Sequence, residues 1–587
     1  MAIVGIDLGT TNSLITAFVD GKSVLIPNSY NEYLTPSVVS LTDNDELLVG
    51  RAAKERLITN PDLSASLFKR YMGTKNIIKL GKKRFLPEEL SSIVLRQLLA
   101  DAENYLQEPV TEAIISVPAY FNANQRSATK TAGMLSGVKV ERLVNEPSAA
   151  ALAYRGDDDD TFIILDFGGG TLDISIVEIF DNVVNICAIA GSNFLGGIDF
   201  DQAIAEAACA ENDIDPFSLS RQEFQILLRA AEMAKIRLGT ENRTDVTAIL
   251  QNKKVSYELT NERLFQLSNH ILERLKNTMR LAVKDSGLSI SEISKCILIG
   301  GSCHMPIIRE YLDRLLRIPV FDSLDVDKAV AIGLGLYAGI KERKQDVKDL
   351  VLTDICPFSL NVDVYNEQNP QKALTYTLIQ RNTILPTRVT RPLWTVFHGQ
   401  TDISIRVNQG EQFYADENIL LGNLNCKVPY NAKDYEKIEV TFSYDINAIL
   451  AVDVEVCSTG AKHALVLTGD GLNLSEKQIE KYVNDIKNLK LAHLERAALL
   501  LERAKRVYAE SDEIMRHYVK ELILSLEKME QMSSIRRTNK ILDSIESNLA
   551  DIEKNLGADE IFNNMSVFLR LIKGGGAGDD IGDDTDE

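Results

Sequence analysis

The sequence predicts a multidomain protein in which an α/β domain comes first, an antiparallel β domain second and α-helices last. The chain has 587 residues, 45% of them hydrophobic, which is more than a single hydrophobic core usually supports. Up to about residue 345, short β-rich runs such as Phe162–Leu165 alternate with longer helical patterns, as in α/β domains. Two similar glycine-rich turns in this part, which begin at Asp7 and Asp166, indicate a duplicated lobe.

The hydrophobic pattern changes after the α/β part. Between about residues 356 and 468, apolar and polar residues alternate, as at Ile403, Ile405 and Val407, which is typical of an antiparallel β domain. The stretch that follows is rich in Leu, Glu, Lys and Ala, and Ser475 and Gln478 have the spacing of a helix capping box. The predicted segments are an α/β domain (1–345), a linker (346–355), a β domain (356–468), helices (469–573) and a disordered acidic tail (574–587).

Composition excludes several classes of protein. With 64 Lys+Arg against 84 Asp+Glu, the net charge is -20, so nucleic acid is not an expected partner. The seven cysteines form no Cys-x-x-Cys pair and no zinc-like cluster, which favours reduced thiols in the cytoplasm. The N-terminus has no signal-peptide pattern and no apolar run reaches transmembrane length, so no membrane partner is expected.

Three glycine-rich turns, each directly after a strand, carry the candidate chemistry. Glycine lets backbone N–H groups approach phosphate oxygens or a nucleotide base closely. One such turn alone is usually only a tight turn, but three in one domain, two of them alike, favour a nucleotide clamped between two facing hairpins. The turns contain Gly9, Thr10, Thr11 and Asn12; Gly168, Gly169, Gly170 and Thr171; and Gly300, Gly301 and Ser302.

Three aspartates flank these turns, namely Asp7, Asp166 and Asp173. An aspartate at the end of a strand is more often a turn residue than a metal ligand. Carboxylates beside phosphates, however, are how Mg²⁺ is usually held, often through water. The pattern therefore favours a Mg²⁺–nucleotide site.

Taken together, these motifs resemble the seventy-kilodalton heat-shock chaperone family, the bacterial DnaK-like kind. The likeness covers nearly the whole chain. The family implies an actin-like ATPase domain of two lobes, a β-sandwich that grips extended polypeptide and a helical lid. The resemblance rests on Gly5–Ser13, Val117–Phe121 with Gln125 and Arg126, Asn145–Pro147, Gly168–Thr171 and Leu195–Gly197.

The resemblance assigns roles around the phosphates. Lys69 matches the lysine that reaches the γ-phosphate and positions the attacking water, although by its sequence alone it is merely a basic residue, more often solvated. Glu146 and Thr171 match residues that organise the metal–phosphate cluster. Asp7 and Asp173 match residues near K⁺ and metal-bound water, and Asp166 matches a carboxylate that orients water. These roles suit phosphoryl transfer to water, which depends on positioning and charge neutralisation.

The family's nucleoside contacts also map onto this chain. Glu232 and Lys235, spaced to share one helix face, match the adenosine-contacting helix, although without the resemblance they would be an ordinary surface ion pair. Gly239, His304 and Ile198 replace the usual Ser, Arg and Glu, which puts nucleotide affinity and exchange rate in question. The resemblance implies ATP or ADP with Mg²⁺ and K⁺, and nucleotide contacts that also include Gly196, Gly197 and Asp327.

The segment 346–355 resembles the family's interdomain linker. Its apolar residues, among them Leu350 and Leu352, can lie exposed or dock as an edge strand on the ATPase domain, which gives a two-state element. A plain first strand of the β domain remains the alternative. Thr353 replaces a usual leucine, which predicts weaker docking. Positions matching the family's coupling contacts or J-domain surface are Pro118, Arg126, Arg142, Asp354 and Arg381.

The β domain matches a domain that binds peptides by main-chain hydrogen bonds and a hydrophobic pocket. Leu393, Val396, Ile403 and Ile405 fall on pocket positions, although each could equally be sandwich core. The short lid and the segment Thr353–Leu360 resemble the specialised bacterial HscC branch. The resemblance implies unfolded or extended client polypeptides and a J-domain co-chaperone as partners, and leaves open a nucleotide exchange factor.

Two other functions compete with an ATP-driven chaperone. A metabolite kinase on the same actin-like fold would not explain the β domain and the helices. A nucleotide-binding regulator without turnover would not explain why Lys69, Glu146 and Thr171 are all present.

Overall fold

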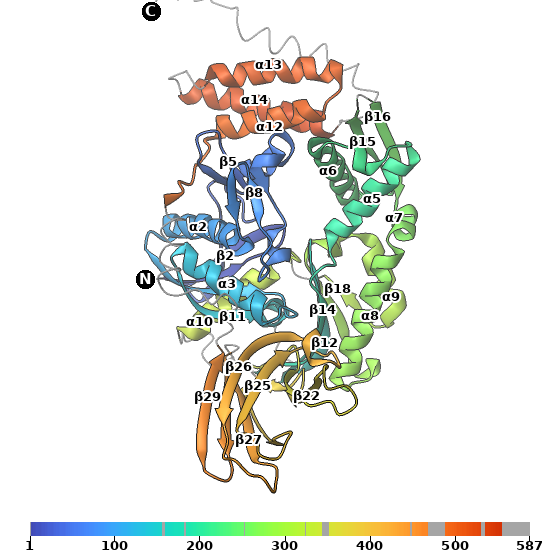
Figure 1. Cartoon of the computed structure of the whole chain (residues 1–587). Helices are drawn as coiled ribbons and strands as arrows, with labels where there is room; N and C mark the ends of the chain where they lie inside the picture. Colours follow the sequence, from blue (N-terminus) through green and yellow to red (C-terminus); the bar gives the residue numbers. More distant parts are fainter. Residues whose placement is uncertain are drawn as a thin grey trace, which may run out of the picture.

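The computed structural model describes residues 2–154, 159–180, 183–251, 253–322, 325–342, 351–445, 449–467, 488–529 and 535–554 (Figure 1). The expected acidic tail, linker residues 346–350 and the Ser475–Gln478 capping box lie outside these residues. Within them, no helix combines the length and apolar character needed to cross a membrane.

Two sheets of the same topology form the first part of the chain. In each sheet, a meander of three antiparallel strands is extended by two parallel strands. We call the part of the chain built on the first sheet lobe I and the part built on the second sheet lobe II. The strand order in lobe I is β3 (Lys22–Ile26), β2 (Asn12–Val19), β1 (Ala2–Asp7), β10 (Val110–Val117) and β11 (Lys139–Asn145). The order in lobe II is β14 (Val183–Ser192), β13 (Leu172–Phe180), β12 (Asp160–Phe167), β17 (Lys295–Ile299) and β18 (Val320–Phe321). The duplicated lobe inferred from the two glycine-rich turns is therefore present.

Helices cover both sheets, and smaller units extend each lobe. Lobe I carries α2 (Pro87–Leu106), α3 (Ala123–Ser136), α4 (Glu146–Ala153) and α10 (Ala329–Lys341). Lobe II carries α5 (Gly197–Glu211), α8 (Asn269–Ser286) and α9 (Pro306–Leu316). The outer unit of lobe I contains β4 (Thr35–Pro36), β5 (Val39–Leu41), β6 (Leu47–Val49), α1 (Arg51–Thr59), β7 (Ser64–Ala65), β8 (Ile78–Leu80) and β9 (Lys83–Phe85). The outer unit of lobe II contains α6 (Arg221–Arg237), β15 (Arg243–Leu250), β16 (Lys253–Thr260) and α7 (Asn261–Leu267).

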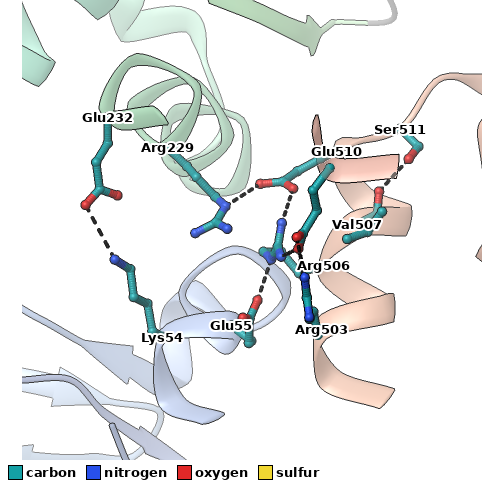
Figure 2. A network of polar contacts seen from close by, with 10 residues as sticks. Lys54, Glu55, Arg229, Glu232, Arg503, Arg506, Val507, Glu510 and Ser511 are labelled. Carbon is teal, nitrogen blue, oxygen red and sulfur yellow. Dashed lines mark hydrogen bonds and ion pairs between the residues drawn. The ribbon is translucent and has the colours of Figure 1, made fainter. Parts of the chain in front are cut away.

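The outer units face each other, with α1 on one side and α6 on the other, and Lys54 of α1 pairs with Glu232 of α6 (Figure 2). Strands β1 and β12 are almost wholly apolar where they are buried, because helices cover both faces of their sheets. Separate apolar cores lie in the two lobes, and a third core packs α4 and α10 between them.

The alternating pattern after residue 356 forms two antiparallel four-stranded sheets that enclose one apolar core. Residues pointing inward, such as Val440, Phe442 and Val452, are fully buried. One sheet has the order β22 (Leu374–Ile379), β21 (Leu360–Val364), β25 (Asp402–Gln409), β26 (Ile419–Lys427). The other has the order β24 (Thr387–Trp394), β27 (Lys437–Tyr444), β28 (Leu450–Val456), β29 (Ala461–Leu467).

The linker divides between the two domains within a few residues. Strand β19 (Val351–Leu352) pairs in parallel with β14 at the edge of the lobe II sheet. Strand β20 (Asp354–Ile355) pairs instead with β23 (Ile384–Leu385) of the β domain. Between them, Thr353 donates its backbone N–H to the Val184 carbonyl (2.9 Å) and its hydroxyl to Asn185 Oδ1 (2.7 Å). Docking at position 353 is thus polar.

The C-terminal helices are α12 (Arg496–Glu510), α13 (Glu513–Met529) and α14 (Ile535–Lys554), and they pack around their own apolar core. They lie at the opposite end of the two lobes from the β domain (Figure 1). The prediction of helix from residue 469 onward is wrong for residues 489–495, which directly precede α12. The backbone groups of Lys490 and Ala492 hydrogen-bond to Leu47 at the edge of β6. Leu489 and Leu491 pack against the lobe I core. The extended conformation therefore allows both the backbone hydrogen bonds and the packing of the two leucines.

Candidate functional site

A cavity of about 620 Å³ lies between the two lobes. All three predicted glycine-rich turns contribute to its lining, together with residues of α1 and α6. The predicted site residues that line it are Asp7, Gly9, Thr10, Thr11, Asn12, Lys69, Glu146, Asp166, Gly168, Gly169, Thr171, Gly197, Glu232, Lys235, Gly239, Gly300, Gly301, Ser302, His304 and Asp327. The size suits a nucleotide-sized ligand.

The two hairpins face each other so closely that side chains would not fit. A Cβ atom on Gly169 would lie 2.3 Å from Thr11, and one on Gly170 would lie 2.5 Å from Thr10. Similarly, a Cβ atom on Gly196 would lie 2.4 Å from the backbone nitrogen of Gly170. Gly170 and Gly196 therefore support the turns from behind and are not part of the cavity lining. The prediction of two facing hairpins is confirmed.

The third turn is fastened to the second. Ser302 donates its hydroxyl to the Gly168 carbonyl (2.7 Å). Gly300 has a φ of 85°, and a Cβ atom on it would lie 2.6 Å from the Phe167 carbonyl oxygen. Glycine is needed here because both the left-handed backbone and the close approach exclude larger residues.

Four carboxylates surround one lysine at the junction of the hairpins. Lys69 bonds to Glu146 at 2.7 Å, and both side chains are less than 10% exposed. Asp166 and Asp173 are also buried nearby, and Asp7 at the end of β1 is half-buried. Their presence raises the negative charge well beyond what one lysine neutralises, so the site suits a bound cation beside phosphate oxygens.

The buried aspartates have raised pKa values. Burial, followed by the charge of Glu146, raises the pKa of Asp7 to about 6 and that of Asp173 to about 7, although Lys69 opposes both shifts. Burial also raises the pKa of Asp166 well above its ordinary value. A divalent cation would favour the ionised forms and reverse these shifts.

No group of three or more His, Cys, Asp or Glu side chains in the described part of the chain is arranged to hold a metal ion directly. Asp173 does not line the cavity, and it accepts the backbone N–H of Tyr120 (3.0 Å). A role of these carboxylates in holding a metal through water and phosphate stays a prediction.

On the other side of the cavity, Glu232 and Lys235 do not pair with each other. Lys235 bonds to Asp201 (2.6 Å) and to the Gly197 carbonyl (2.9 Å). Glu232 instead reaches across the gap to Lys54 of α1 (3.4 Å). Glu232 and Lys235 therefore do not form the surface ion pair that their spacing alone favoured.

His304, which stands where the family usually has arginine, pairs with Asp327. His304 Nε2 lies 3.2 Å from Asp327 Oδ2, and the His304 side chain is 63% exposed at the cavity mouth. A Cβ atom on Gly239 would lie 3.1 Å from the backbone carbonyl oxygen of Ile236, so a side chain there would require a small shift of the backbone.

A family model described as Hsp70 protein matches residues 3–568. The chain belongs to the Hsp70 family. Members of the Hsp70 family are ATP-driven chaperones that bind ATP or ADP with Mg²⁺ and act on unfolded polypeptides. Membership assigns this chain the same general activity. The mixed α/β content, the two facing lobes and the two-sheet β domain are consistent with an actin-like ATPase and a β-sandwich.

The predicted coupling residues of this Hsp70 lie where the β domain meets the lobes. Asn145 donates to both carboxylate oxygens of Asp354 at 2.7 Å, and Arg126 bonds to Asn145 Oδ1 at 2.6 Å. Arg381 bonds to Asp285 of α8 at 2.8 Å. These contacts join β20 and the loop after β22 to lobes I and II, respectively.

Two further predicted positions border this junction. Arg142 bonds to the Tyr337 hydroxyl and stacks on its ring, with 4.9 Å from the guanidinium to the ring centre. Pro118 is buried at the end of β10. It precedes Tyr120, whose ring lies 4.5 Å from that of Phe358 in the β domain. Leu350 lies outside the described residues, whereas Leu352 packs against the core between the lobes.

The four predicted peptide-pocket residues have different surroundings. Ile405 is 5% exposed and belongs to the β-domain core. Leu393 and Ile403 are half-buried against that core, and Val396 is half-buried in the loop after β24. Their role in peptide binding stays a prediction.

Several site residues had no visible signal in the sequence. Ser116 donates to Asp7 (2.7 Å), Ser37 donates to the Gly9 carbonyl (2.8 Å), and Arg70 pairs with Asp199 of the other lobe (2.7 Å). Ser116 could have been suspected because it lies near the end of β10, shortly before Pro118. Ser37 and Arg70 reach the site through tertiary folding, and no local pattern marks them.

Replacing Asp173 by asparagine should stabilise the nucleotide-free protein at high pH only. The pKa of Asp173 is raised to about 7, so its favourable contribution to folding is complete below about pH 4 and is lost as pH rises through 7. We expect Asp173→Asn to be more stable than the wild type by about 2–4 kcal/mol at pH 8 and equally stable near pH 4. Unfolding measured at the two pH values, with exposed Asp434→Asn as control, checks this. Equal effects at both pH values would contradict it.

Proposed function

We propose that this Hsp70 couples ATP hydrolysis at the Lys69 site to binding and release of extended peptides by the β domain. The observation that carries the proposal is the buried Lys69–Glu146 pair within three further carboxylates, where two glycine hairpins meet. The glycine turns fit phosphates because no side chain blocks their backbone, and the carboxylates fit Mg²⁺ and K⁺ because their charge exceeds that of Lys69.

When bound, Mg²⁺–ATP supplies the γ-phosphoryl group that water attacks. The turns at Gly9–Asn12 and Gly168–Thr171 would hold the phosphates through backbone N–H groups and threonine hydroxyls. Lys69 would neutralise charge on the γ-phosphate and position the water. Asp166, whose pKa is raised by burial, would orient that water and accept its proton, while Asp7 and Asp173 would hold metal-bound water.

The β domain would bind the client by adding an extended peptide segment and burying side chains at Leu393, Val396 and Ile403. The C-terminal helices would act as a lid that moves between their position on the ATPase lobes and the β domain. Pairing of β19 with β14 would depend on which nucleotide is bound. We place the protein in the short-lidded HscC branch and in the bacterial cytoplasm, where its seven free cysteines would stay reduced.

ATP turnover by the purified protein tests this function directly. We expect slow basal hydrolysis that rises about fivefold or more when an unfolded peptide and a J-domain protein are added, which corresponds to a coupling of at least about 1 kcal/mol. An exchange factor would add to the rate only if product release limits turnover. Stimulation by a sugar would favour a metabolite kinase, and absence of turnover would favour a regulator that only binds nucleotide.

A further inference from the structure

The C-terminal helices contact both ATPase lobes through a network of charged side chains, drawn in Figure 2. At its centre is Arg506 of α12, only 1% exposed. Its guanidinium bonds to Glu55 of α1, to Glu510 of its own helix and to Glu553 of α14. A buried arginine is tolerated only when its charge is paired and its donors are satisfied, so this arginine holds α1, α12 and α14 together.

The network also reaches lobe II. The second carboxylate oxygen of Glu510 bonds to Arg229 Nε of α6 at 3.1 Å (Figure 2). The preceding residue, Ala509, packs against the lobe II core. The last turn of α12 therefore bridges from α1 of lobe I to α6 of lobe II.

Helix α6 is part of the nucleotide cavity. Arg229, Glu232 and Lys235 are spaced three residues apart, which places them along one helix face, and all three line the cavity. Glu232 also pairs with Lys54 across the gap. Any separation of the two lobes at this point would break the Lys54–Glu232 contact and the Glu510–Arg229 contact together.

The C-terminal part of the chain makes more extensive contacts with lobe I than with lobe II. Leu499 packs with Val38, Leu48 and Ala52. The backbone of Lys490 and Ala492 extends the β6 edge at Leu47. The helices can thus remain on lobe I while the contact with Arg229 opens or closes.

We propose that the C-terminal helices act as a clamp across the nucleotide cleft, in which Glu510 ties lobe II to lobe I and slows nucleotide release. This inference rests on the proposed function, because it takes the cavity to bind nucleotide. Linkage requires the reverse effect as well: a nucleotide that holds the lobes together favours docking of the helices. The position of the C-terminal helices would then control how long the nucleotide stays bound, in addition to the access of peptides to the β domain.

Release of a fluorescent ATP analogue, chased with excess unlabelled ATP, tests the clamp in the full-length protein. We expect Glu510→Gln to release the analogue about fivefold to tenfold faster than the wild type, within the range of coupling between linked sites. Arg496→Gln is the matched control. Arg496 pairs with Glu546 (2.5 Å) and Asp543 (2.7 Å) inside the helical bundle, and its loss should leave the release rate unchanged.

A second variant, Arg229→Gln, makes the test independent of the helices' own stability. If Glu510 acts through Arg229, the double variant should release nucleotide no faster than the faster single variant. Unchanged release in Glu510→Gln, additive effects, or equal acceleration in Arg496→Gln would each overturn the clamp. A wild-type protein that binds no nucleotide would instead overturn the proposed function, so the two failures are distinguishable.

Discussion

Replacement of Lys69 by alanine is expected to abolish ATP turnover, with a loss of at least about 100-fold, while nucleotide still binds. The side chain bonds to Glu146 at 2.7 Å and lines the cavity together with residues of the glycine-rich turns. Loss of a charge that acts mainly on the transition state lowers kcat far more than affinity. Single-turnover hydrolysis and analogue binding, measured on the same preparation, separate the two effects.

Matched controls sharpen the Lys69 experiment. Lys79→Ala removes an exposed lysine from β8 and should leave turnover unchanged. Glu146→Gln keeps the shape of the partner but removes its charge, and should lower turnover, because the buried Lys69 ammonium then loses the carboxylate that pairs with it. Turnover in Lys69→Ala close to that of the wild type would remove this lysine from the mechanism.

Replacement of Leu352 by aspartate is expected to abolish stimulation of turnover by peptide but to preserve basal hydrolysis. Leu352 pairs with Val184 at the edge of the lobe II sheet and packs against the core between the lobes. A carboxylate there would cost several kcal/mol when docked and nothing when exposed, so the linker would leave β14. Turnover with and without an unfolded peptide measures the effect.

Ile77→Asp is the control for the added charge, because Ile77 is 52% exposed and far along the chain from the linker. A variant with both Leu350 and Leu352 replaced by aspartate should show the same loss without further decrease in basal rate. Peptide stimulation that survives in both linker variants would show that β19 docking does not carry the coupling.

The phosphate side of the site could be predicted well from the sequence because its chemistry is local. A strand, an aspartate and a glycine turn occur within about ten residues at Asp7 and again at Asp166, and the structure places both copies opposite each other. The period-two pattern after residue 356 likewise led to the two sheets of the β domain, because alternation reports directly which face is buried.

Contacts between distant segments were not predictable in the same way. The sequence showed Glu232 and Lys235 as neighbours on one helix, yet each binds a partner elsewhere, Lys54 and Asp201. The extended segment before α12 was expected to be helical because its composition is helical, and the edge of β6 overrode that preference.

What the sequence by itself determined is therefore the change from an α/β to an antiparallel β pattern, the two facing glycine hairpins and the family. Only the tertiary structure decided where the linker docks, that Thr353 binds Asn185, and that Arg506 and Glu510 join α12 to both lobes. The physical reason is the range of the interactions. Hairpins and amphipathic patterns are encoded by neighbouring residues, whereas a buried ion pair between residues 55 and 506 leaves no periodic or local trace and exists only once the chain has folded.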